Sequence, residues 1–203
     1  HYIQTHPEFR DDINYDWKAS SWIEGTLDDT YGLLANYSDR WLMDYGDSNS
    51  GNVISRKNQE GWRESFKNED GSDGTVDLYT SDVGFEKITT FENKEIDHLA
   101  LNIGQILAAL VTLKTGGAMV VKQYTFFESL NISLYAILTN VFEEVYISKP
   151  VTSRPTNTET YVIGKGYRGY QHSKIYIDLL FNKISEFENE KDTDKEKKKE
   201  ERI

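Results

Sequence analysis

The 203-residue chain contains no cysteine, which excludes disulfide bonds and metal sites built from thiolates. Long apolar runs are missing as well. Residues 99–113 are interrupted by Asn102, Gly104 and Gln105, and they fall short of the roughly 20 residues that span a bilayer. The first residues are polar and acidic, unlike a secretory signal peptide. We therefore expect a cytoplasmic protein that does not associate with a membrane.

A surplus of positive charge is also missing, because the formal net charge is −11. Such a charge disfavours indiscriminate binding of nucleic acid. The charges are unevenly distributed, however. Residues 1–100 carry 21 acidic and 9 basic side chains, whereas residues 101–185 carry 5 and 8. An anionic ligand is therefore expected to bind the 101–185 segment.

The length of the chain is enough to bury a sizeable core, and we expect one domain over residues 1–187. Residues 188–203 form a charged tail, which is either a solvated extension of a helix or a frayed end. The chain begins at His1 and not at methionine, so we expect natural sequence upstream of it.

Helical and strand patterns alternate along the chain. In 93–113 apolar side chains recur at helical spacing, and Gly116-Gly117 are expected to end this helix. The patterns predict helices within 58–74 and at 93–113, 127–142 and 172–187, and strands at 76–82, 118–122, 143–148 and 160–166, with a weaker strand signal at 16–22. This alternation predicts an α/β fold with a mostly parallel sheet and helices on both of its faces.

Charged side chains stand at the ends of three predicted strands. Asp82 and Lys122 each end a buried strand, and Glu159 stands just before another, after a loop. Because ligands of parallel sheets bind beyond the carboxyl ends of the strands, we expect these side chains to converge. From the residues alone, a lysine that snorkels from a strand end, or an ordinary salt-bridge cluster, is the simpler explanation.

The motifs around these residues form an ordered set. They read D-V-G-F at 82–85, G-G-A-M-V-V-K at 116–122, F-E-E-V-Y-I-S-K-P at 142–150 and S-R-P-T-N-T-E-T-Y-V-I-G-K-G at 153–166. The set resembles the FtsJ/RrmJ-type ribose 2′-O-methyltransferases, and within that superfamily it most resembles the mRNA-cap enzymes. The likeness is greatest to the FtsJ-like enzymes of large cytoplasmic DNA viruses, of the African swine fever virus kind. It covers roughly residues 15–168.

The resemblance implies a Rossmann-like fold that binds S-adenosyl-L-methionine and acts through a Lys-Asp-Lys-Glu tetrad. Asp82, Lys122 and Glu159 match the last three members of the tetrad. The family's first strand, glycine-rich cofactor loop and first lysine precede the region that His1 begins. We therefore expect an upstream segment or a partner chain to complete the cofactor site.

The resemblance also implies residues that bind the cofactor and the RNA. The cofactor-binding set is Gly51, Asn52 and Asp82, with Asn52 where an aspartate is usual. The RNA-binding set lies in the loop before Glu159 and comprises Lys149, Ser153, Arg154 and Asn157. Capped mRNA is the RNA that this likeness implies. A phosphate is the expected partner of Arg154, and a surface ion pair is the alternative.

Other residues support more ordinary explanations. Tyr124 and Phe126 follow Lys122 and either line the nucleotide site or pack in the core. The four histidines have no metal-ligand spacing, and we predict no metal site. His98 is expected at the surface or boundary of its helix.

Lys122 is the expected base, because a ribose hydroxyl is a poor nucleophile until its proton leaves. The lysine must then act in its neutral form. The carboxylates of Asp82 and Glu159 raise its pKa, whereas burial, the cofactor's sulfonium and a second lysine lower it. The alternative function is a catalytically inactive scaffold, or an RNA-binding subunit of a viral assembly. A dinucleotide-dependent oxidoreductase is disfavoured, because no G-x-G-x-x-G follows a strand.

Overall fold

The computed structural model describes residues 16–21, 32–41, 51–84, 98–124, 126–151, 153 and 158–200. The chain divides into two compact units, His1–Gly51 and Asn52–Ile203. The first unit contains the helix α2 (Leu33–Asn36) and the 3-10 helix η2 (Ser38–Arg40). The weak strand signal at 16–22 corresponds to a single bridge between Ala19 and Trp41.

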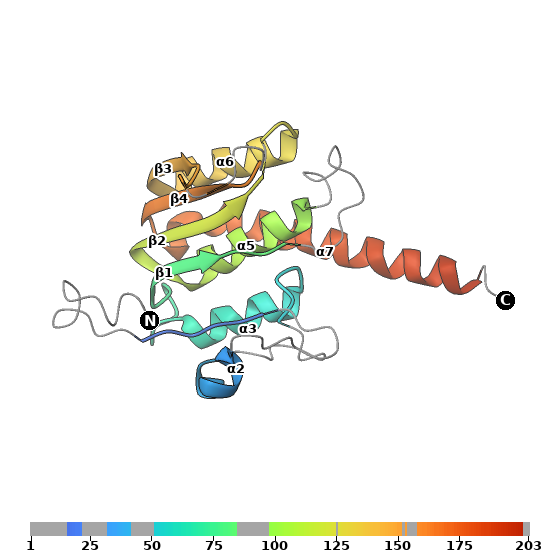
Figure 1. Ribbon diagram of the computed structural model, residues 1–203, viewed down its shortest axis with the longest axis horizontal. Coiled ribbons are helices and arrows are strands. Elements are labelled where there is room, and N and C mark those ends of the chain that lie inside the picture. The colour runs from blue at the N-terminus through green and yellow to red at the C-terminus, as the bar shows by residue number, and fades with distance from the viewer. Residues whose placement is uncertain are drawn as a thin grey trace. The chain divides into compact units, whose positions relative to one another are not determined.

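The second unit is built on a four-stranded sheet. Its strands are β1 (Val76–Ser81), β2 (Leu113–Gln123), β3 (Phe142–Ser148) and β4 (Thr160–Tyr167), in the order β1-β2-β4-β3 (Figure 1). β1 pairs parallel to β2, and β4 pairs antiparallel to both β2 and β3. Three strands therefore run in one direction and β4 runs against them. The physical reason is that only residues 149–159 separate β3 from β4, fewer than the dozen or more that a crossover between parallel neighbours needs.

Four helices accompany the sheet: α3 (Arg56–Phe66), α5 (Leu99–Thr112), α6 (Ser129–Val141) and α7 (Tyr170–Glu200). They agree in place and order with the predicted helices. Residues 85–97, which include the expected beginning of the 93–113 helix, lie outside the described residues. The backbone of α7 continues to Glu200, so the charged tail extends the helix.

The prediction that Gly116-Gly117 end the long helix is wrong. The helix α5 ends at Thr112, and both glycines lie inside β2. The strand register explains their place. Val76 pairs with Leu113 but Leu78 pairs with Ala118, so β2 bulges between these pairs. Gly116 has φ of +82°, a conformation that favours glycine, and it permits this bulge.

The core lies between the sheet and its crossover helices. From β1 to β2 and from β2 to β3 the chain moves the same way across the sheet, so right-handed crossovers place α5 and α6 on the same face. That face carries Met119, Val121 and Val162, which pack with fully buried side chains of α5, α6 and α7. On the opposite face Thr80, Val120, Ile163 and Tyr146 form one row across the sheet. Tyr146 is 47% exposed there.

A close contact fixes the start of the second unit on α5. At Gly104 the helix approaches the 53–55 segment so closely that a Cβ atom would lie 2.5 Å from the carbonyl oxygen of Val53. The Gln59 amide of α3 donates to the carbonyls of both Val53 and Gly104, at 2.6 Å and 2.9 Å. Among the described helices, none combines the length and the apolar character needed to cross a bilayer.

Candidate active site

Asp82 and Lys122 lie side by side at the carboxyl ends of two parallel strands. The last β1–β2 pair is Ser81 with Val121, so Asp82 and Lys122 are the next residues of their strands. Lys122 Nζ is 2.6 Å from Asp82 Oδ1. The lysine side chain is 11% exposed, whereas that of Asp82 is 70% exposed. The nearly buried Lys122 amine therefore contacts a carboxylate that is still largely exposed to solvent.

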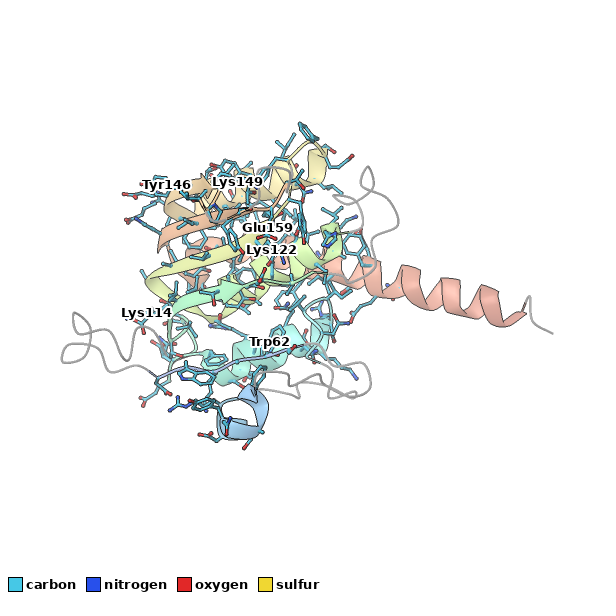
Figure 2. All side chains as sticks on the ribbon, in the orientation of Figure 1. Trp62, Lys114, Lys122, Tyr146, Lys149 and Glu159 are labelled. Atoms are coloured by element: carbon cyan, nitrogen blue, oxygen red, sulfur yellow. The ribbon has the colours of Figure 1, made fainter. Side chains whose placement is uncertain are left out.

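Glu159 reaches the same end of the sheet from the antiparallel strand. β4 pairs Lys122 with Tyr161, and the Tyr161 hydroxyl donates to Glu159 Oε1 at 3.2 Å. In Figure 2 Glu159 and Lys122 are labelled next to each other, at the end of the strands away from Lys114. The structure therefore brings Asp82, Lys122 and Glu159 to one end of the sheet, as expected from strand order.

Tyr161 belongs to this cluster and was not among the predicted site residues. A signal for it was available in the sequence, because residues two apart in a strand share a face and Tyr161 is two residues after Glu159. Burial is the main cause that raises the pKa of its hydroxyl, and the charges of Asp82 and Glu159 raise it further. The hydroxyl therefore stays protonated and acts as a hydrogen-bond donor to Glu159.

The Lys122 ammonium is held in its charged form by its neighbours. Burial lowers the pKa of Lys122, but the hydrogen bond with Asp82 and the nearby Tyr124, Asp82 and Glu159 raise it above its ordinary value of 10.5. This agrees with the expectation that the two carboxylates keep the lysine protonated. A role as base requires additional positive charge to come close when the ligands bind.

Tyr124 covers another side of the lysine. Its ring centroid lies 5.7 Å from Lys122 Nζ, and the ring of His98 meets Tyr124 edge-on at 4.7 Å. His98 is only 1% exposed, so the expectation of a surface or boundary position was wrong. His98 directly precedes α5, and from there its ring packs against the ring of Tyr124. Phe126 packs against Tyr135 and the core cluster, which favours the packing interpretation for that residue.

A buried glutamine holds the backbone at Lys122. Since the β1–β2 pairing ends at Val121, the next carbonyl lacks a partner in β1, and the Gln105 amide donates to the Lys122 carbonyl at 2.8 Å. Gln105 is fully buried. In the sequence this residue was only an interruption of an apolar stretch. A buried amide inside such a stretch is a signal for a specific hydrogen bond.

Two of the predicted RNA-binding residues meet in the β3–β4 loop. Lys149 Nζ donates to the carbonyl of Glu159 at 3.0 Å and to the Ser153 hydroxyl at 3.2 Å. The Lys149 amine therefore joins the two ends of the loop. Arg154 and Asn157 lie outside the described residues. Binding of RNA by the four residues stays a prediction.

Gly51 and Asn52 have clear local roles in the fold. Gly51 has φ of +58°, and a Cβ atom there would lie 2.2 Å from the Ser21 carbonyl oxygen. The Asn52 side-chain oxygen accepts the Ile54 N–H at 3.1 Å, and its backbone carbonyl accepts from Asn58 at 2.9 Å. Their contact with a cofactor stays a prediction. Asp82, the third predicted cofactor-binding residue, is a largely exposed carboxylate at a strand end, and its contact with a cofactor also stays a prediction.

The described residues contain no group of three or more histidine, aspartate or glutamate side chains placed to hold a metal ion. The acids of the cluster are instead arranged around a lysine. This arrangement suits proton transfer and the positioning of a cation.

A protein-family model described as FtsJ-like methyltransferase matches residues 34–167, which is more than half of the chain. The chain belongs to the FtsJ-like methyltransferase family. The matched region includes Asp82, Lys122 and Glu159 together with Gly51 and Asn52. The resemblance drawn from the motifs, and the α/β fold class that it implied, are therefore confirmed.

Two relatives show the range of this FtsJ-like group. The "Probable methyltransferase EP424R" of African swine fever virus (strain Badajoz 1971 Vero-adapted) is 35% identical over 170 residues, which cover 74% of this chain and 37% of the relative. The cap-specific mRNA (nucleoside-2′-O-)-methyltransferase 2 of Drosophila melanogaster is 31% identical over 176 residues, which cover 82% of this chain and 24% of the relative. The chain thus spans less than half the length of either relative.

Among solved structures, a ribosomal RNA methyltransferase from Plasmodium falciparum is similar with a TM-score of 0.44 and 20% identity, over 64% of each chain.

Proposed function

We propose that this FtsJ-like chain is the catalytic part of an enzyme that methylates a ribose 2′-hydroxyl of RNA, with the cap-proximal nucleotide of mRNA as substrate. The observation that carries the proposal is the nearly buried Lys122, paired with Asp82 at the carboxyl ends of two parallel strands. Membership of the family and the cap-specific relative support the same reaction class.

S-adenosyl-L-methionine, when bound, supplies an electrophilic methyl group on a sulfonium. The chain's own task is to remove the proton of the acceptor hydroxyl. Lys122 in its neutral form accepts that proton on Nζ and becomes an ammonium, while the ribose oxygen gains the electron pair it needs as a nucleophile. The ammonium then returns the proton to solvent through the exposed side of Asp82.

The acids around Lys122 have separate roles in this proposal. Asp82 fixes the direction of the amine by its 2.6 Å contact and offers its remaining exposed surface to the positive end of the cofactor. Glu159, held by the Tyr161 hydroxyl at 3.2 Å, orients the amine from the β4 side. Because both acids favour the ammonium, the cofactor's positive charge and a second lysine upstream are needed to release the proton.

The RNA-binding role of the β3–β4 loop follows from its charge and its position. Lys149, Ser153, Arg154 and Asn157 precede Glu159, so a strand of RNA held by this loop brings a ribose to the acidic end of β4. Phosphate contacts of this kind orient a nucleic acid without reading its sequence.

Replacement of Lys122 by Met tests the proposal. Methyl transfer to capped RNA is expected to be lost, while binding of S-adenosyl-L-methionine in calorimetry is retained. Stability is expected to change by only about 0–1 kcal/mol, because the partner carboxylate faces solvent. Substantial remaining turnover would refute the role of Lys122 as base.

Lys114→Met is the matched control. Lys114 pairs with Asp77, also across β1 and β2 but near the opposite end of the strands (Figure 2). Loss of this pair is expected to leave methyl transfer unchanged. Calorimetry is run on this chain and on a longer chain with natural upstream sequence. If neither binds the cofactor, the inactive scaffold replaces the enzyme as the better function.

A further inference from the structure

The surroundings of Lys122 Nζ differ sharply from one side to the next. Asp82 contacts the amine at 2.6 Å, and the Tyr124 ring stands 5.7 Å away, backed by His98. Tyr161 is the β4 residue paired with Lys122, and its hydroxyl donates a hydrogen bond to Glu159. These neighbours leave the lysine side chain 11% exposed. A substrate hydroxyl can therefore reach the amine from only a narrow range of directions.

Gly84 occupies a further side and contributes no side chain there. A Cβ atom at this position would lie 3.5 Å from Lys122 Nζ, 4.0 Å from Lys122 Cε and 3.4 Å from the Tyr124 hydroxyl. The backbone at Gly84 is itself exposed. The absent side chain thus leaves space between the exposed residue 84 and the amine, beside the Tyr124 hydroxyl.

We propose that Gly84 forms the entry through which the acceptor hydroxyl reaches Lys122, and that residue 84 sets the size of the group that can approach. The inference rests on the proposed function and deepens it. A hydroxyl that gives its proton to Nζ must come within about 2.6–3.2 Å of it. A methyl carbon 3.5 Å from Nζ would occupy the space that the oxygen and its ribose carbon need.

The same geometry makes the proposal testable without loss of the fold. The φ angle of Gly84 lies outside the left-handed region, so alanine can adopt this backbone. The contacts that its methyl group would make are at ordinary van der Waals distances. Gly84→Ala is therefore expected to fold with an unchanged or slightly raised melting temperature, because alanine also restricts the unfolded chain.

The experiment compares the parent, Gly84→Ala and Gly84→Val by two readouts. The first is the rate at which formaldehyde and cyanoborohydride methylate Lys122, measured by peptide mass spectrometry with Lys114 as internal reference. Lys114 is 49% exposed and lies far along β2 from Gly84, so its labelling should stay constant. The second is kcat/KM for methyl transfer to capped RNA, with calorimetric affinity for S-adenosyl-L-methionine measured alongside.

Slower labelling of Lys122 relative to Lys114, with a loss of about 100-fold in kcat/KM and an unchanged cofactor affinity, would support the proposal. A rate of Lys122 labelling that falls from the parent to Gly84→Ala to Gly84→Val supports the entry even if the chain is inactive. Failure of the proposed function can therefore be distinguished from failure of this inference. Unchanged Lys122 labelling in both variants would overturn the inference, as would full activity of Gly84→Val.

Discussion

Replacement of Gly104 by alanine puts the packing of α5 to a quantitative test. In an exposed helix interior this change stabilises by about 1 kcal/mol, because glycine is the poorer helix former. Here the new Cβ atom would lie 2.5 Å from the Val53 carbonyl oxygen and 2.8 Å from its carbonyl carbon. Helix and segment must therefore move apart by close to 1 Å, an overpacking that costs about 1–3 kcal/mol.

The separation has a second cost. Gln59 donates to the carbonyls of both Val53 and Gly104, so it bridges the two elements that are forced apart. Stretching one of these bonds costs about 0.5–1.5 kcal/mol. Against the gain in helix propensity, the net effect is a destabilisation of about 2 kcal/mol, which lowers the melting temperature by about 4–8 °C in a chain of this size.

Equilibrium unfolding in urea measures this difference. The result that would refute the reasoning is a Gly104→Ala variant as stable as the parent or more stable. Val53→Ala in the same background is the control for side-chain crowding. Because the closest contact is with the backbone carbonyl, removal of the Val53 methyl groups is not expected to restore stability.

Two further predictions concern charge at the site. Since Asp82 is a main cause of the raised pKa of Lys122, Asp82→Asn is expected to lower that pKa. The rate of methyl transfer rises with pH as Lys122 loses its proton, so this rising limb should move to lower pH. If the rising limb stays at the same pH, the group whose ionisation controls the rate is not Lys122. If Lys149 contacts a phosphate, Lys149→Met should weaken RNA binding and reduce the salt slope by about 0.7. An unchanged slope would assign Lys149 to the loop contacts with Glu159 and Ser153 alone.

Local patterns were sufficient for much of the fold. The apolar runs that became β1 to β4 and the helical spacing that became α5 to α7 are properties of short segments, and each element was found. Two bounds differ from the prediction, because β2 already begins at Leu113 and α7 continues to Glu200. The main error shows the limit of such patterns. The pair Gly116-Gly117 has the composition of a helix end, yet it lies in a bulge of β2. The bulge forms because β2 advances by five residues, from Leu113 to Ala118, while β1 advances by two.

The site was predicted in part, and the missing members are informative. The convergence of Asp82, Lys122 and Glu159 was expected because charged residues stand at strand ends, and the resemblance to FtsJ-type enzymes implied their catalytic role. Gln105 and His98 were not, since nothing in their own neighbourhood shows that one supports the Lys122 carbonyl and the other backs the Tyr124 ring. Those contacts depend on the packing of α5 under β2.

The amino-acid sequence by itself determined the order of strands and helices, the family and the residues that carry the proposed chemistry. These follow from composition, periodicity and motif, which are local properties. Only the tertiary structure decided that β4 runs against its neighbours, that Tyr161 holds Glu159 and that Gly84 leaves one side of Lys122 open. The physical reason is that each of these depends on distances between residues 2 to 45 positions apart, which strand register and helix packing set together.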